Sequence, residues 1–111
     1  MTFQEQLNLY IEELSCSGRE LAKNSDISET ILSRYRKGER IPGADSDYLK
    51  KLAAGIALTA EQKEKKIDQE RVLEVLLAAL KQEEKTEIFY YQKFDILLRE
   101  LEINVSKMAS A

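Results

Sequence analysis

One short segment of this chain carries polar side chains at the spacing of a helix face. Between residues 28 and 37 carboxylate, hydroxyl and guanidinium groups recur at intervals of three and four residues. Such an array can both accept and donate hydrogen bonds, as reading base edges in the major groove of DNA requires. The side chains that would contact bases are Glu29, Thr30, Ser33 and Arg34.

A second set of residues around this segment could contact phosphates. These candidates are Ser17, Arg19, Arg36, Lys37 and Arg40. The whole chain has a net charge of −3, but residues 19–40 contain more basic than acidic residues. This local excess favours contact with DNA. Its small size argues against tight non-specific binding, which needs a larger phosphate-neutralising surface.

Two short helices joined by a tight turn would position these side chains. Ser17 with Glu20 three residues later predicts a capping box at the start of the first helix. Asp26 is expected to adopt a left-handed turn conformation, and Ser28 to cap the second helix. Gly38 is expected to end that helix. The side chains expected to pack between the two helices are Leu21, Ala22, Ile27, Leu32 and Tyr35.

This pattern resembles the lambda-repressor-like helix-turn-helix family, also called the xenobiotic-response-element family. The residues that carry the resemblance are Leu21-Ala22, Ile27-Ser28, Leu32-Ser33-Arg34-Tyr35, Gly38, Arg40 and Pro42. The resemblance covers roughly residues 3–58 and implies a module of four or five helices whose third helix reads bases. It places Glu29, Thr30 and Arg34 at base-reading positions and Lys37 at a phosphate-contacting position.

Three positions depart from the family pattern. Ile31 is an apolar residue where Ser or Thr is common, and it is expected to add to the core. Gly18 stands where the family often has a Gln that braces a phosphate. Arg36 stands where a Glu often pairs with an Arg of the first helix, a position at which this chain has Ile11. We expect Arg36 either to pair with Glu12 or Glu13 or to bind phosphate.

The rest of the chain predicts further helices and an all-α fold. A first helix capped by Thr2 and a fourth capped by Asp45 or Ser46 complete a DNA-binding domain at residues 1–58. Residues 59–111 form a helical extension. In it, Thr59 is expected to cap a long helix over about 60–85, followed by a second long helix over about 87–101. The apolar face of the extension would be covered by the module, by the last helix or by another subunit. Its candidate oligomer-interface residues are Leu73, Leu76, Leu77, Leu80, Phe89 and Phe94.

The end of the chain repeats part of its beginning at an offset of 87 residues. Phe3 falls on Tyr90, Leu7 on Phe94, and the match continues through the cap to Ala22 on Ala109. Two explanations stay open. Either the chain is the N-terminal part of a longer protein with tandem modules, its second helix-turn-helix truncated, or amphipathic helices resemble one another and the last helix serves dimerisation.

Several chemistries have no residues to support them. The chain has no His, a single Cys and four scattered Gly, so neither an enzyme active site nor a cofactor or metal site is expected. Cys16 is expected to be a buried structural thiol, which suits a reducing cytoplasm. The polar start of the chain lacks the basic and apolar regions of a signal peptide, and no apolar run is long enough to cross a bilayer.

The sequence therefore favours one functional hypothesis over another. The first is a sequence-specific DNA-binding transcriptional regulator from a bacterium, a phage or a mobile element. It would act on double-stranded DNA as a homodimer or as tandem modules. The second is a protein-interaction module, either antitoxin-like or a regulatory adaptor, whose helices hold a protein partner.

Overall fold

The computed structural model describes residues 1–83, and this part of the chain is helical without any strand. The helices are α1 (Phe3–Leu14), α2 (Gly18–Ser25), α3 (Glu29–Lys37) and α4 (Asp47–Gln62), followed by a helix over residues 69–83. The prediction of an all-α chain is confirmed for these residues. The candidate interface residues Phe89 and Phe94, the second long helix and the copied segment from Tyr90 lie outside the described residues.

The helix ends follow the predicted capping residues closely. Thr2 accepts a hydrogen bond from the Glu5 amide at 3.1 Å and caps α1. Asp26 ends α2 in the left-handed conformation, with φ at 55°. Gly38 ends α3 at φ 73°, and its amide and that of Glu39 donate to the carbonyls left free in the last turn of α3.

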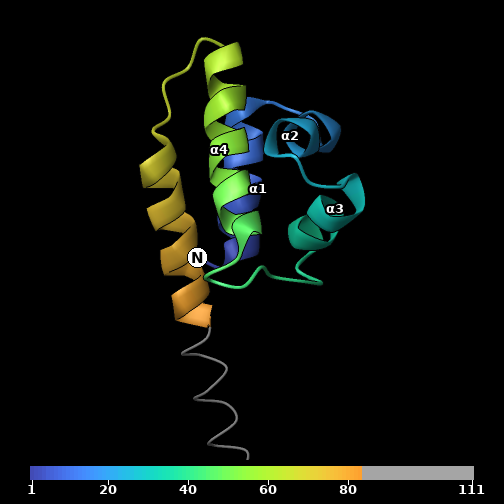
Figure 1. Ribbon diagram of the computed structural model, residues 1–111, viewed down its shortest axis with the longest axis vertical. Coiled ribbons are helices and arrows are strands. Elements are labelled where there is room, and N and C mark those ends of the chain that lie inside the picture. Colours follow the sequence, from blue (N-terminus) through green and yellow to red (C-terminus); the bar gives the residue numbers. More distant parts are fainter. Residues whose placement is uncertain (84–111) are drawn as a thin grey trace, which may run out of the picture.

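One apolar core holds the described elements together. It is formed by Phe3, Leu7 and Ile11 of α1, the inward faces of α2, α3 and α4, and four residues of the helix 69–83. In Figure 1 α2 and α3 lie on one side of α4, and the helix 69–83 lies on the other. The exposed side of α3 is thereby left uncovered by the rest of the described chain.

The expected long helix over 60–85 is wrong, because the chain breaks between α4 and the helix 69–83. Thr59 does not cap a helix: it is buried inside α4, and its hydroxyl donates to the Gly55 carbonyl at 2.7 Å. Lys63 ends α4, and Glu64 turns the chain at φ 57°. Asp68 starts the next helix by accepting from the Arg71 amide at 3.2 Å. The expected division after residue 58 falls within α4.

The helix 69–83 packs into the core of its own chain. Leu76 and Leu80 are 0% and 1% exposed, so neither presents a surface to a second copy. The prediction that these two residues form an oligomer interface is therefore wrong. Their burial shows that the apolar face of this helix is covered by the core of the same chain. Leu73 and Leu77 are only partly buried at the edge of the same core.

Candidate nucleic-acid interface

The candidate DNA-contacting element is α3, and its buried side determines which side remains accessible. Leu32 and Tyr35 are 0% and 1% exposed and anchor α3 in the core. The Tyr35 ring packs edge-on against Phe3, with ring centroids 5.8 Å apart. The Ser28 hydroxyl accepts from the Ile31 amide at 3.1 Å and begins α3 as predicted. Helical periodicity then turns the residues on the opposite side of α3 outward.

The structure brings the predicted base-contacting residues onto one accessible side of α3. Glu29, Thr30 and Arg34 are exposed, and Ser33 beside them is half-buried. No other described element covers them. Their donors and acceptors are therefore free to meet a ligand as broad as a duplex groove.

The predicted phosphate-contacting residues surround this side of α3 but differ in how they are held. Arg19, Lys37 and Arg40 are exposed. Ser17 begins α2, and its hydroxyl accepts from the Glu20 amide at 3.1 Å, which confirms the predicted cap. Arg36 is half-buried in an open groove between α1, α2 and α3.

An ion pair joins the starts of α2 and α3. Arg19 Nε lies 3.6 Å from a carboxylate oxygen of Glu29, and both side chains are largely exposed. Such a surface pair contributes little to stability, from about 0 to 1 kcal/mol. It does hold a candidate phosphate contact beside a candidate base contact in the free protein.

The predicted partners of Arg36 are not the ones it has. Neither Glu12 nor Glu13 forms an ion pair with Arg36. Its Nε donates instead to Asn8 Oδ1 at 3.4 Å, because the crossing of α1 and α3 places Asn8, one turn earlier than Glu12, opposite Arg36. The side-chain amide of Asn8 also donates to the Arg36 carbonyl at 2.9 Å. Gln4 and Asn8 were missed, although amides four residues apart on one helix face are a recognisable signal.

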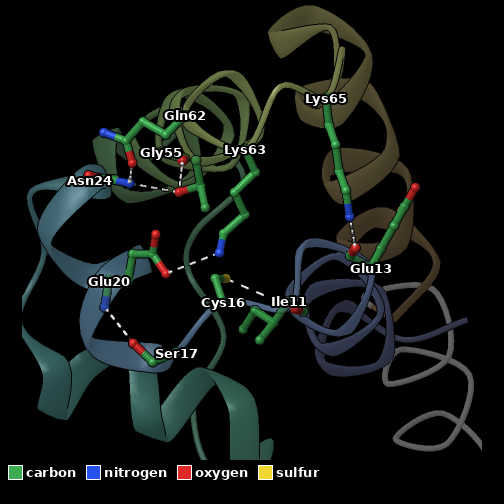
Figure 2. Close-up of polar contacts among 11 residues, drawn as sticks. Ile11, Glu13, Cys16, Ser17, Glu20, Asn24, Gly55, Gln62, Lys63 and Lys65 are labelled. Atoms are coloured by element: carbon green, nitrogen blue, oxygen red, sulfur yellow. Dashed lines mark hydrogen bonds and ion pairs between the residues drawn. The ribbon is translucent and has the colours of Figure 1, made fainter.

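A polar network joins α2 to α4 (Figure 2). Asn24 Nδ2 donates to Thr59 Oγ1 at 2.8 Å and to Gln62 Oε1 at 2.9 Å. Lys63 Nζ lies 3.7 Å from a carboxylate oxygen of Glu20. Gly55 allows the two helices to approach closely, since a methyl group there would stand 2.7 Å from Ser25 Cα.

The corner between α1 and α2 is fastened from the loop after α4. Lys65 Nζ donates to the Glu13 carbonyl at 2.6 Å, close to the end of α1 (Figure 2). Cys16 lies in the same corner with its Sγ 4.0 Å from the Ile11 carbonyl. Burial, and then the charge of Glu20, raise the pKa of the Cys16 thiol, so it stays neutral near pH 7. A neutral, half-buried thiol fits the predicted structural role.

Two other features are absent from residues 1–83, a metal-binding cluster and a membrane-spanning helix. No group of three or more His, Cys, Asp or Glu side chains in that range could hold a metal ion. No helix there is long and apolar enough to cross a membrane.

Comparison with protein-family models, curated proteins and solved structures finds no match to this chain. The functional argument therefore depends on the geometry of α3 and its surroundings.

Proposed function

We propose that this protein is a sequence-specific DNA-binding regulator of transcription that inserts α3 into the major groove. The observation that carries the proposal is the division of α3 into a buried apolar side and an uncovered polar side. Arg34 would donate to guanine, Thr30 would contact a base edge or a thymine methyl group, and Glu29 would accept from cytosine. Ser33 lies at the margin of this surface.

Phosphate contacts would orient α3 in the groove. Lys37 and Arg40 at the end of α3 are exposed, and Arg19 and Ser17 lie at the amino end of α2. Backbone amides at a helix start and basic side chains both favour phosphate oxygens. These contacts would set affinity and register and leave sequence preference to the base-contacting residues.

Two recognition helices are needed for firm binding to a short operator. We propose that a second copy of the chain, or a second module, places another such helix about 34 Å away, one turn of DNA. Leu73 and Leu77, half-buried on the helix 69–83, remain candidates for contact between copies. The setting would be the cytoplasm of a bacterium, or of a cell carrying a phage or mobile element.

The second candidate function is a protein-interaction module, with no enzymatic activity in either case. Its net charge of −3 and the exposed side chains of Leu9 and Leu58, 46% and 41% accessible, favour it. In this alternative the same helices would hold a protein partner, as an antitoxin or an adaptor does.

Selection from a pool of random double-stranded DNA tests the proposal. The full chain is incubated with the pool, bound duplexes are separated by gel shift, and several rounds are sequenced. We expect one motif to be enriched, and Lys81→Ala, on the helix 69–83 away from α3, to enrich the same motif. If no motif is enriched and a protein partner copurifies with the chain, the interaction module is favoured.

A further inference from the structure

The end of α3 is held by two amides from α1. The last carbonyls of a helix have no partner within the helix and need one elsewhere. Gln4 Nε2 and Asn8 Nδ2 donate to the Arg36 carbonyl at 3.0 and 2.9 Å. α1 therefore fixes the backbone of α3 at the residue that carries a candidate phosphate contact.

Asn8 also holds the side chain of the same residue. Its Oδ1 accepts from Arg36 Nε at 3.4 Å while its Nδ2 binds the Arg36 carbonyl. One amide thus contacts both the main chain and the guanidinium of Arg36. This double contact limits the directions in which the guanidinium can point.

The absence of a side chain at residue 18 gives the guanidinium its place. A methyl group on Gly18 would stand 3.0 Å from Arg36 Nη1, which is closer than an ordinary van der Waals contact. The Arg36 guanidinium therefore lies directly over the first residue of α2. Arg19 and Lys37 line the same open groove, and so do the carboxylates of Glu12 and Glu29.

Among residues 1–83, Arg36 has no ion-pair partner for its charge. Asn8 is an uncharged partner and leaves the outer nitrogens of the guanidinium able to donate to an anion. A phosphate reaching the amino end of α2 would meet this guanidinium.

We propose that Asn8 and Gly18 are positioning residues for the DNA interface, which together aim the Arg36 guanidinium at a backbone phosphate beside the amino end of α2. The inference rests on the proposed function. The lack of a side chain at position 18 makes room for the basic side chain at position 36. The phosphate contact is then supplied by α3 and not by the side chain at residue 18.

Gly18→Ala tests the proposal without harming the fold. Ala is the better helix former at a helical position, so the urea midpoint should stay or rise. The added methyl group obliges the guanidinium, the far end of a flexible side chain, to shift by a few tenths of an ångström. Binding to the selected duplex should weaken by up to about tenfold at about 0.1 M salt, and the magnitude of the slope of log K against log salt should fall by up to about one unit. The matched control is Gly43→Ala, whose methyl group would lie 3.8 Å from Ser46 Cβ.

Asn8→Ala and Arg36→Ala complete the test. Each should reduce the magnitude of the slope of log K against log salt by about one unit. The double variant Asn8→Ala with Arg36→Ala should lose no more binding affinity than Arg36→Ala alone. If wild-type protein and Arg36→Ala differ in slope while Gly18→Ala and Asn8→Ala match wild type, the positioning role is overturned and the proposed function stands. If wild-type protein enriches no duplex at all, both proposals fail.

Discussion

At the scale of single residues, position on α3 separates two kinds of contact. Thr30 and Arg34 lie on the uncovered side of the helix, whereas Lys37 lies at its end. In the proposed complex the first two would meet base edges and the last a phosphate. Substitutions at the two places should therefore change different properties of binding.

Lys37→Ala is expected to weaken binding to all sequences alike. Removing one phosphate contact should reduce the magnitude of the slope of log K against log salt by about one unit. The order of preferred sequences should not change. Fluorescence anisotropy titrations at several salt concentrations measure both quantities. Lys81→Ala provides the control, and a slope identical to that of wild type would argue against a phosphate contact at Lys37.

At the scale of elements, the close contact of α2 with α4 supports the interface from behind. Gly55 lies in the middle of α4, where its lack of a side chain lets Ser25 approach. Thr59 and Asn24 join the same two helices by a hydrogen bond. Because α3 follows α2 after a short turn, this contact helps to determine where α3 lies.

Gly55→Ala should destabilise the fold despite the better helix propensity of Ala. Forcing a methyl group into this contact is expected to cost about 1–3 kcal/mol of unfolding free energy through overpacking. Ser25→Ala is the matched variant: it removes a buried hydroxyl that has no hydrogen-bond partner among the described residues, so stability should stay or rise. Urea unfolding gives both values, and a Gly55→Ala protein as stable as wild type would contradict the close contact.

Local signals in the sequence predicted the helix ends better than the contacts between helices. Ser17, Ser28 and Gly38 act where they were expected, because a cap depends on residues only a few positions away. Thr59 was misassigned as a cap, because α4 continues through it. Its hydroxyl donates to the Gly55 carbonyl and accepts from Asn24, which is 35 residues away in the sequence.

The partner of Arg36 could not be predicted for a similar reason. The angle at which α1 crosses α3 selects Asn8 over Glu12, and the sequence pattern does not specify that angle. The side of α3 that would remain exposed was predictable, because burial of Leu32 and Tyr35 fixes it through helical periodicity.

At the scale of the whole molecule, the helix 69–83 belongs to the same core as α1 and α4. Leu76→Ala should lower the unfolding free energy by about 2–5 kcal/mol, because it leaves a cavity in a buried site. Leu58→Ala, at a position 41% exposed, should change it little. A Leu76→Ala protein that keeps its stability and changes only its oligomeric state in analytical ultracentrifugation would restore the interface role rejected above.

The stability of the folded chain should also fall in alkaline solution. Burial raises the pKa values of Tyr10, Cys16 and Tyr35, so the folded protein keeps these protons to a higher pH than the unfolded chain does. The unfolding free energy should decrease as the pH rises past about 8.5, where an ordinary thiol titrates, and on past about 10 for the tyrosines. Urea unfolding from neutral pH upward measures this, with Cys16→Ser expected to remove the earliest part of the decline. A stability that rises over this range would show the sign to be wrong.

The central claim is that the uncovered side of α3 reads base edges. It is tested most directly by measuring the binding of wild-type protein and Arg34→Ala to the selected duplex and to every single-base variant of it. The account predicts a loss of about 1–3 kcal/mol on the selected duplex and a loss of preference confined to one base pair. An equal loss on every duplex, or no loss on any, would contradict it.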